Sequence, residues 1–355
     1  MTSRTAPLRV AVVGGGWVSR HRHLPSLRSH DGVEVVGMVV PRGALDPAVR
    51  TALAAEDPRF RFGNRLDEEW LDGVDAVMVG TPPDTHHPLV VDALRRGFHV
   101  LVEKPFALTV ADAEEMISAA ERNDRMLCVV HNLQFGRAAS RAREQLASGA
   151  LGELRGVFGT QSSNHERRLP TWYPDLPLGL FTDEAPHLVY LLQAFLPEAT
   201  LESLYVGRPL GPSDRTPDLV TLAVRSGDLV GSLQMTFVGA VSEWLLVIMG
   251  TRGTMVLDFF RDVAFTVPND HGHLPRNVLG TQLRAVGGHL ADTVAAGIRR
   301  VRSQLDYGND EVVDRFVTAV RTGRADPHID GARGLDVVRV LEAAAQSRST
   351  DAATP

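Results

Sequence analysis

The first 131 residues alternate short apolar runs with segments of helical periodicity. The apolar runs are rich in valine and too short for helices, so they predict buried strands. These runs cover 8–13, 33–40, 75–80, 98–102 and 127–131, with a weaker one at 60–62. Apolar residues spaced by three and four predict helices at 18–29, 48–56, 88–96 and 110–123. Strict alternation of strand and helix is typical of a doubly wound parallel sheet.

The pattern changes after Gly149 and Gly152, where strand-like runs follow one another with little helical signal. They predict an antiparallel meander over 154–161, 201–207, 219–225, 229–237, 244–249, 254–259 and 263–267. A helix is expected from near Pro186 to Leu196, because proline is tolerated in a first turn. Further helices are expected at 283–302, 310–322 and 334–346. The expected fold is α/β, with an N-terminal domain at 1–131, an α+β C-terminal domain with an open, mainly antiparallel sheet at 132–346, and a frayed tail at 347–355.

A glycine cluster follows the first predicted strand and opens the first helix, in the stretch 13–19. Gly14 would permit a tight turn, Gly16 would let the backbone approach a pyrophosphate, and the helix start at Trp17 and Val18 would present N–H groups to it. Ser19 stands where a third glycine is usual, and a serine is small enough for close packing of helix on strand. The pattern predicts a Rossmann domain that binds a dinucleotide, although a simple tight turn would look similar.

The end of the second strand lacks the acidic residue that usually holds the adenosine ribose of NAD. Arg42 occurs there instead, and a guanidinium would attract a 2′-phosphate. The sequence therefore favours NADP over NAD.

The chain holds 37 basic residues, and Lys104 is its single lysine. An arginine excess is explained by base composition of the gene, but lysine differs chemically because its ammonium is compact and its pKa can be tuned. Lys104 follows Glu103 at the end of the fifth strand, at the sheet edge where ligands of such folds bind. The loop of Thr81, Pro82 and His86 follows the fourth strand at the same edge.

Composition and charge exclude several other classes of protein. Hydrophobic residues make up 44% and charged residues 23%, which is unlike a disordered chain. A formal net charge of -6 and scattered arginines leave no basic patch for nucleic acid. No apolar stretch approaches the ~20 residues of a membrane span. The one cysteine, Cys128, lies in an apolar run and fits a reducing cytoplasm. The histidines show no metal-ligand spacing, so no metal is expected.

The motifs as a set resemble the glucose-fructose oxidoreductase, inositol dehydrogenase and rhizopine catabolism family (Gfo/Idh/MocA). The likeness rests on Gly14-x-Gly16, on Thr81-Pro82-Pro83 with His86, and above all on 97–105, which ends in Glu103-Lys104-Pro105. It continues through Gly149-x-x-Gly152 and Gly179-x-x-x-Asp183-x-x-x-His187, so it covers essentially the whole chain.

The resemblance implies an NAD(P)-dependent oxidoreductase that moves a hydride between nicotinamide and a carbinol or keto carbon of a sugar, nucleotide sugar or cyclitol. It makes Lys104, Asp183 and His187 the catalytic group. Without it, Asp183 and His187 would be an N-cap and an incidental histidine, although their spacing of four puts them on one helix face. The resemblance also implies a Trp172 near the nicotinamide and a homodimer or homotetramer formed through the C-terminal sheet.

Two positions depart from the family pattern, and other functions stay open. An Asp is common three residues beyond the catalytic His, where this chain has Tyr190, and Gln134 stands where an Arg is common. Glu184, beside Asp183, has no assigned role. One alternative is an NAD-dependent glycoside hydrolase with transient redox. Another is a dinucleotide-sensing regulator without catalysis. The sequence does not name the substrate, the direction of reaction or the exact oligomer.

Overall fold

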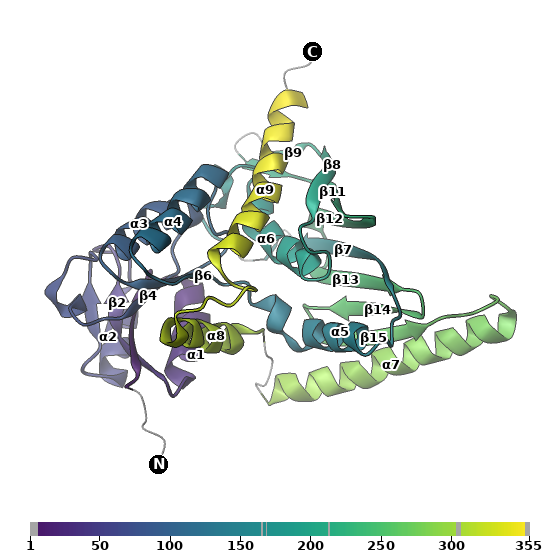
Figure 1. Cartoon of the computed structure of the whole chain (residues 1–355), viewed down its shortest axis with the longest axis horizontal. Helices are drawn as coiled ribbons and strands as arrows, with labels where there is room; N and C mark the ends of the chain where they lie inside the picture. Colours follow the sequence, from purple (N-terminus) through teal and green to yellow (C-terminus); the bar gives the residue numbers. More distant parts are fainter. Residues whose placement is uncertain (1–5, 165, 168, 212–213, 303–306, 352–355) are drawn as a thin grey trace. The chain divides into compact units, whose positions relative to one another are not determined.

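The computed structural model describes residues 6–164, 166–167, 169–211, 214–302 and 307–351. The chain divides into two compact units, and Figure 1 shows their elements. The first unit is Met1–Asn132 with Asn309–Glu342, and the second is Leu133–Gly308 with Ala343–Pro355. The sequence pattern had assigned 309–342 to the second domain. These residues join the first unit because their apolar faces pack there, which no local signal at residue 308 reveals.

A six-stranded sheet forms the centre of the first unit. Its order is β3-β2-β1-β4-β5-β6, and its strands pair in parallel. The strands are β1 (Leu8–Val13), β2 (Val33–Val39), β3 (Arg61–Gly63), β4 (Ala76–Val79), β5 (His99–Val102) and β6 (Leu127–Val129). The order confirms the doubly wound sheet predicted from the alternating runs.

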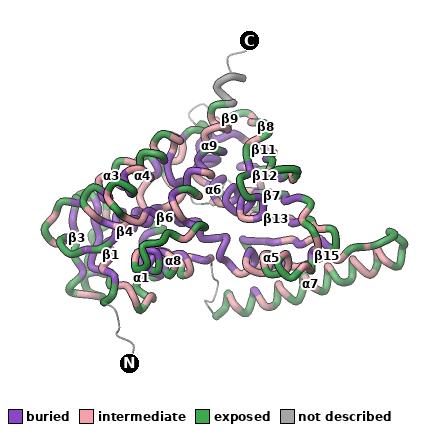
Figure 2. The backbone as a smooth tube through the Cα atoms, in the orientation of Figure 1, coloured by how far each residue is buried: buried purple, intermediate pink, exposed green. Residues whose placement is uncertain are grey.

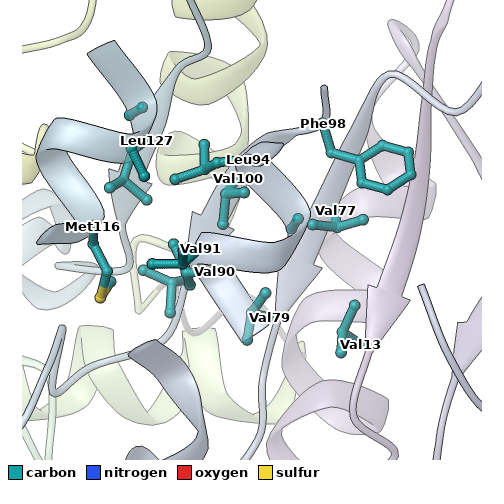
Figure 3. Packing of buried hydrophobic residues seen from close by; sticks show 14 of the residues in the cluster. Val13, Val77, Val79, Val90, Val91, Leu94, Phe98, Val100, Met116 and Leu127 are labelled. Atoms are coloured by element: carbon teal, nitrogen blue, oxygen red, sulfur yellow. The ribbon is translucent and has the colours of Figure 1, made fainter. Parts of the chain in front are cut away.

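Helices cover this sheet on both faces, as its continuous apolar strands require. The helices are α1 (Leu24–Ser29), α2 (Pro47–Glu56), α3 (His86–Arg95), α4 (Val110–Arg122), α8 (Asn309–Thr322) and α9 (Gly331–Asp351), of which 331–342 belong to this unit. α3 and α4 lie side by side, and α8 packs on α1 (Figure 1). Figure 3 shows the core under α3 and α4, where Val90, Val91 and Leu94 meet Val77 and Val100. Met78 and Leu101, which alternate with these strand residues, are buried on the opposite face.

The first helix contains a π-helical turn directly after its opening residues Trp17 and Val18. The predicted segment 18–29 forms a π-helical turn, η1 (Ser19–His23), and then α1. Short 3-10 turns occur at η2 (Glu69–Leu71), η3 (Pro83–Thr85), η4 (Leu133–Phe135) and η5 (Tyr173–Asp175).

The second unit contains a seven-stranded sheet of order β15-β14-β13-β7-β12-β11-β8. Its strands are β7 (Leu154–Asn164), β8 (Thr200–Val206), β11 (Leu219–Ser226), β12 (Leu229–Gly239), β13 (Glu243–Gly250), β14 (Gly253–Asp258) and β15 (Val263–Pro268). The mainly antiparallel sheet is confirmed, but a simple meander is wrong. β7 lies between β13 and β12 and pairs in parallel with β12. A separate hairpin joins β9 (Pro209–Gly211) and β10 (Asp214–Pro217).

Three helices complete this unit, namely α5 (Arg137–Ala147), α6 (Leu180–Gln193) and α7 (Pro275–Val301). α6 packs on β7 and β12, and α7 runs along β15 (Figure 1). α6 is almost wholly buried, whereas α7 is mostly exposed (Figure 2). The sequence pattern missed α5 because alanines, rather than large apolar residues, form its buried face. The predicted tail at 347–355 is helical in α9 as far as Asp351, and 352–355 lie outside the described residues.

α6 starts six residues earlier than the proline suggested. Pro186 lies inside it, and the helix begins after Gly179. The backbone N–H of Leu180 donates to Thr216 Oγ1 at 2.9 Å, which caps the first turn. A Cβ on Gly179, whose φ is +55°, would lie 2.1 Å from the same oxygen. A distant strand, β10, therefore sets the start of α6.

Candidate active site

The glycine loop lies where the strand order of the parallel sheet reverses. β1 has β2 on one side and β4 on the other, and ligands of such sheets bind beyond the carboxyl ends of the strands at this point. The backbone N–H of Gly14 donates to Val39 O at 2.9 Å. The N–H of Gly80, which follows β4, donates to Val13 O at 2.8 Å. The first bond joins the loop after β1 to the end of β2, and the second joins the loop after β4 to the end of β1, so both lie at one edge of the sheet.

The glycines of this loop serve different steric needs. Gly14 has a φ of +103°, and a Cβ there would lie 2.3 Å from Gly80 O. At Gly16, by contrast, none of the described atoms lies within 4 Å of the Cβ position. Gly16 is thus not required by packing, and it leaves open space at the start of a helix, where N–H groups face outward. The loop fits the pyrophosphate of a dinucleotide.

Ser19 secures the packing of the helix on this edge. It is fully buried, and its hydroxyl donates to Gly80 O at 3.0 Å. A glycine at position 19 would also allow the helix to pack closely on the strand, but it could not make this hydrogen bond. Trp17 and Val18, at the start of the helix, remain 40% and 42% exposed. The indole of Trp17 stacks on the ring of His21 with centroids 4.8 Å apart.

His86 connects the loop after β4 to the loop after β5. The side chain is fully buried, with Nδ1 2.8 Å from Pro105 O and Nε2 3.0 Å from Thr81 O. Burial lowers the pKa of His86, so the ring is neutral and donates from one nitrogen at a time. Its two nitrogens therefore lie against the backbone of Thr81 and of Pro105, which directly follows Lys104. Pro82 directly follows Thr81 and is partly exposed.

Glu103 supports Lys104 through its backbone. One carboxylate oxygen, Oε2, accepts the backbone N–H of Lys104 at 2.9 Å. The other, Oε1, lies 2.8 Å from His23 Nε2, at the end of η1. The lysine side chain is partly exposed, and the Lys104–Pro105 peptide bond is cis. The segment that follows β5 is therefore tied to the helix that follows the glycine loop.

His131, just beyond β6, is buried at the same edge. Burial lowers its pKa to about 3, and the negative charge of Glu103 acts in the opposite direction. The ring is therefore neutral near neutral pH. Cys128, on β6, is also buried, and burial raises the pKa of its thiol.

Arg42 and Trp172 occupy exposed or partly exposed positions. Arg42 follows β2 in an exposed turn. Trp172 lies in the second unit, immediately before η5, and is partly buried. The predicted cofactor residues Gly14 to Lys104 thus belong to the first unit, and Trp172 belongs to the second.

Asp183 and His187 are the two residues of α6 that keep exposed surface. The other residues of this 14-residue helix are buried, including Glu184 and Pro186. Asp183 lies in the first turn and His187 one turn later, so both lie on the same face. A carboxylate and an imidazole left accessible on an otherwise buried helix are suited to acid and base chemistry.

Two aromatic side chains fix the His187 ring. Its Nδ1 lies 2.9 Å from the hydroxyl of Tyr190, which also accepts the backbone N–H of Leu133 at 3.0 Å. The indole of Trp244, on β13, lies against the ring with centroids 5.1 Å apart. Tyr190 is only 3% exposed. The sequence marked Tyr190 as a departure from the family pattern but did not predict this contact.

Glu184 is a buried carboxylate that polar groups surround. It accepts hydrogen bonds from Gln161 Nε2, from Ser163 Oγ at 3.0 Å and from the guanidinium of Arg167. Burial lowers the pKa of Arg167, while the negative charge of Asp183 opposes that shift. Glu184, which the sequence left without a role, therefore holds β7 and the guanidinium of Arg167 against α6, next to Asp183.

Other contacts had no signal in the sequence. His23 and Glu103 are 80 residues apart in the chain, and the sequence indicates no pairing between them. Alternation along β7 places Gln161 and Ser163 on one face, but nothing local shows that α6 supplies their partner. Within the described ranges, no three His, Cys, Asp or Glu side chains come together as a metal site would require. In the same ranges, no helix combines the length and apolarity needed to cross a membrane.

Comparisons with known families agree with this architecture. The family model described as oxidoreductase family, NAD-binding Rossmann fold, matches residues 8–131. The model described as GFO/IDH/MocA C-terminal domain matches residues 139–256.

Individual proteins show the same relation. YdgJ, an uncharacterised oxidoreductase of Escherichia coli (strain K12), is 30% identical over 151 residues, which are 41% of each chain. An alpha-N-acetylgalactosaminidase of Shewanella oneidensis is 29% identical over 167 residues, 45% of this chain and 36% of that protein. The matches thus span less than half of these relatives.

Solved structures match over almost the whole chain. GenD2, from gentamicin A biosynthesis and in complex with NAD, has a TM-score of 0.77 and 24% identity, with 99% of this chain and 96% of that chain covered. The WlbA dehydrogenase from Bordetella pertussis, in complex with NADH and UDP-GlcNAcA, has a TM-score of 0.76 and 20% identity, with 97% and 96% covered. At these identities the structures show a shared fold, and together with the two family models they place this chain in the Gfo/Idh/MocA family of oxidoreductases.

Proposed function

We propose that this protein is an NAD(P)-dependent oxidoreductase acting on a sugar, nucleotide sugar, cyclitol or related polyhydroxylated molecule. The observation that carries the proposal is the exposure of Asp183 and His187 on the otherwise buried helix α6. The open space at Gly16 and the supported Lys104 supply the matching features of the cofactor domain. Relatives of known ligand are consistent with this class, since WlbA binds NADH and UDP-GlcNAcA and GenD2 belongs to gentamicin A biosynthesis.

In the mechanism we infer, the residues of this chain handle charge and protons. A bound nicotinamide supplies the hydride acceptor or donor. His187 takes the proton of a substrate hydroxyl during oxidation and returns it during reduction. Lys104 donates a hydrogen bond to the reacting oxygen and stabilises its developing negative charge. Asp183 orients His187 or accepts a hydrogen bond from a neighbouring hydroxyl. Gly14, Gly16, Trp17, Val18, Thr81 and Pro82 would line the cofactor site, together with Trp172.

Arg42 leads us to favour NADP over NAD. It follows β2, where an acid would bind the ribose hydroxyls, and it is exposed and positively charged. Replacing Arg42 by Ser should weaken NADPH binding more than NADH binding, by roughly 10-fold or more for a charge-assisted phosphate contact. Equal or better binding of NADH by the unaltered protein would contradict the preference.

The second unit supports a homodimer or homotetramer formed through its sheet. One face of the sheet packs on α6, while Phe158, Val230 and Met249 stay 37–41% exposed on strands β7, β12 and β13. A self-association through this face would cover them. The single, buried Cys128 is consistent with a cytoplasmic location.

The direct test is nicotinamide absorbance with a panel of sugar nucleotides, sugars and cyclitols in both directions, with each cofactor. Lys104→Arg keeps the charge but loses the compact ammonium, so turnover should fall by orders of magnitude. The matched control is Arg59→Lys, a reverse exchange at a side chain that is 84% exposed. Near-normal turnover of Lys104→Arg would refute the assigned role.

The similarity to glycosidases favours one alternative, an NAD-dependent glycoside hydrolase with transient redox. Such an enzyme would release a sugar with no net change in nicotinamide absorbance. Product analysis of glycoside substrates with tightly bound cofactor distinguishes it from a dehydrogenase.

A further inference from the structure

Tyr190 connects the candidate acid/base residue to the backbone of a different segment. Its hydroxyl lies 2.9 Å from His187 Nδ1 and accepts the backbone N–H of Leu133, in η4, at 3.0 Å. Tyr190 and His187 also make an edge contact, with ring centroids 5.7 Å apart. Because Tyr190 is 3% exposed, water cannot readily replace either bond.

The hydrogen-bonding capacity of a phenol explains what this contact can do. A backbone N–H only donates, so the bond from Leu133 occupies one lone pair of the Tyr190 oxygen. The hydroxyl can then donate its proton to Nδ1 when that nitrogen is unprotonated. Its remaining lone pair can accept from Nδ1–H when the nitrogen is protonated. A carboxylate in this position could only accept.

The hydroxyl also carries no charge. An aspartate three residues beyond His187 would favour the imidazolium, because an opposite charge within hydrogen-bond distance stabilises the charged form. The uncharged indole of Trp244, from β13, also lies against the ring, and the carboxylate of Asp183 lies one turn earlier on the same face of α6. The Tyr190 oxygen therefore holds the ring without adding to its negative surroundings.

We propose that Tyr190 is the positioning residue of His187, and that its hydroxyl holds Nδ1 in both protonation states so that Nε2 is directed to the substrate. This proposal rests on the proposed function, which makes His187 the acid/base residue. The contact between Tyr190 and His187 can nevertheless be tested without any reaction. It also explains why a tyrosine can stand where the family commonly has an aspartate. The neutral hydroxyl of Tyr190 can bind Nδ1 of His187 in either tautomer, whereas a charged carboxylate could only accept a hydrogen bond.

The first measurement is independent of turnover. Ring ¹⁵N chemical shifts of His187 are followed against pH in the cofactor-free protein, with His187→Gln identifying the signal. In Tyr190→Phe the Nδ1 shift should change and the neutral ring should populate a different mixture of tautomers. In Tyr190→Asp the titration midpoint of His187 should rise by about one pH unit or more. The control is Tyr205→Phe, since Tyr205 is 61% exposed on β8 and should leave the signal unchanged.

The second measurement is the pH profile of kcat and KM on whichever substrate the screen identifies. Tyr190→Phe should lower kcat by roughly 10–100-fold, the range found when the hydrogen-bond partner of a metal-ligating histidine is removed. KM should change much less. Tyr190→Asp should recover part of kcat and shift the profile toward higher pH. A titration and kcat that are unchanged in both folded variants would overturn the proposal.

The two measurements separate the two ideas. If no redox substrate is found but the ¹⁵N shifts respond to Tyr190→Phe, the positioning contact stands and the proposed function fails. If redox activity is found and neither readout responds, the function stands and the role of Tyr190 is wrong. Circular dichroism and thermal unfolding of each variant confirm that the signals come from folded protein.

Discussion

His23 Nε2 lies 2.8 Å from Glu103 Oε1, and the two side chains are only 4% and 13% exposed. The second oxygen of Glu103 accepts the backbone N–H of Lys104. One carboxylate thus joins the helix after the glycine loop to the segment that carries the candidate catalytic lysine. This relationship makes Glu103 a support for Lys104.

Glu103→Gln should impair both stability and turnover. The amide can still accept from the backbone N–H of Lys104, but it removes the negative charge beside His23 and from that hydrogen bond, and a hydrogen bond to a charged group contributes about 1.5–3 kcal/mol. We expect a lower melting temperature and a kcat reduced by roughly 10-fold or more. Glu114→Gln, at an exposed position on α4, is the matched control. Wild-type stability and kcat in Glu103→Gln would show that the carboxylate charge is dispensable.

Gly14→Ala should lower the stability of the fold, whereas Gly16→Ala should leave it unchanged. A Cβ at position 14 would meet Gly80 O at 2.3 Å with φ at +103°, so this variant should lose about 1–3 kcal/mol or more of stability. At position 16 the described surroundings leave the Cβ in open space, so the melting temperature should stay close to that of the wild type.

Gly16→Ala should instead affect the binding of the cofactor. If a pyrophosphate approaches the backbone at Gly16, the added methyl should weaken cofactor binding by about 10-fold, which is ~1.4 kcal/mol. Isothermal titration with NADPH and NADH measures it. Unchanged affinity for both cofactors in a stable Gly16→Ala protein would remove this loop from the binding site.

The alternation of buried strands and helices made the first unit predictable. Its strands are apolar on both faces, so each appears as a short continuous run bounded by a glycine or a turn. Lys104 was recognisable for a different reason, since a single lysine stands out in an arginine-rich chain. Local patterns of this kind place residues at the correct edge of the sheet.

Long-range contacts account for what the sequence did not reveal. Thr216 sets the start of α6, and the pairing of β12 with β7 in parallel depends on the whole second unit. The contact between His23 and Glu103 forms only when the helix after β1 and the segment after β5 meet at one sheet edge. In the sequence, Tyr190 was recognisable only as a departure from the family's aspartate. Its partner is the backbone N–H of Leu133, and a backbone contact cannot be recognised from residue types.

Glu184→Gln should destabilise the second unit. The change leaves the guanidinium of Arg167 without its buried counter-charge, and breaking a buried ion pair typically costs about 3–5 kcal/mol. Because Arg167 is about one third exposed, with 32% of its side-chain surface accessible, we expect the lower part of that range. Chemical unfolding measures the loss.

The double variant Arg167→Met with Glu184→Gln separates charge from packing. Removing both charges avoids an unpaired one, so the double variant should be more stable than the sum of the single losses predicts, by ~1 kcal/mol or more. Additive losses would mean that Gln161 and Ser163, rather than Arg167, hold Glu184 in place.

His131 should make the first unit sensitive to mild acid. Burial lowers its folded-state pKa to about 3 from the ordinary 6.5. Below about pH 6.5 the unfolded chain therefore binds a proton that the folded chain does not, and stability is lost as the pH falls toward the folded pKa. Between about pH 7.5 and about pH 5.5 this one group should lower the free energy of unfolding by ~1.4 kcal/mol.

The variant His131→Gln tests this expectation. It has no proton to gain, so its unfolding free energy should decline by that much less than that of the wild type over the same interval. His271→Gln, at an exposed position, should decline as the wild type does. Equal acid sensitivity of His131→Gln and the wild type, measured by urea unfolding at both pH values, would show that His131 takes up its proton in the folded state.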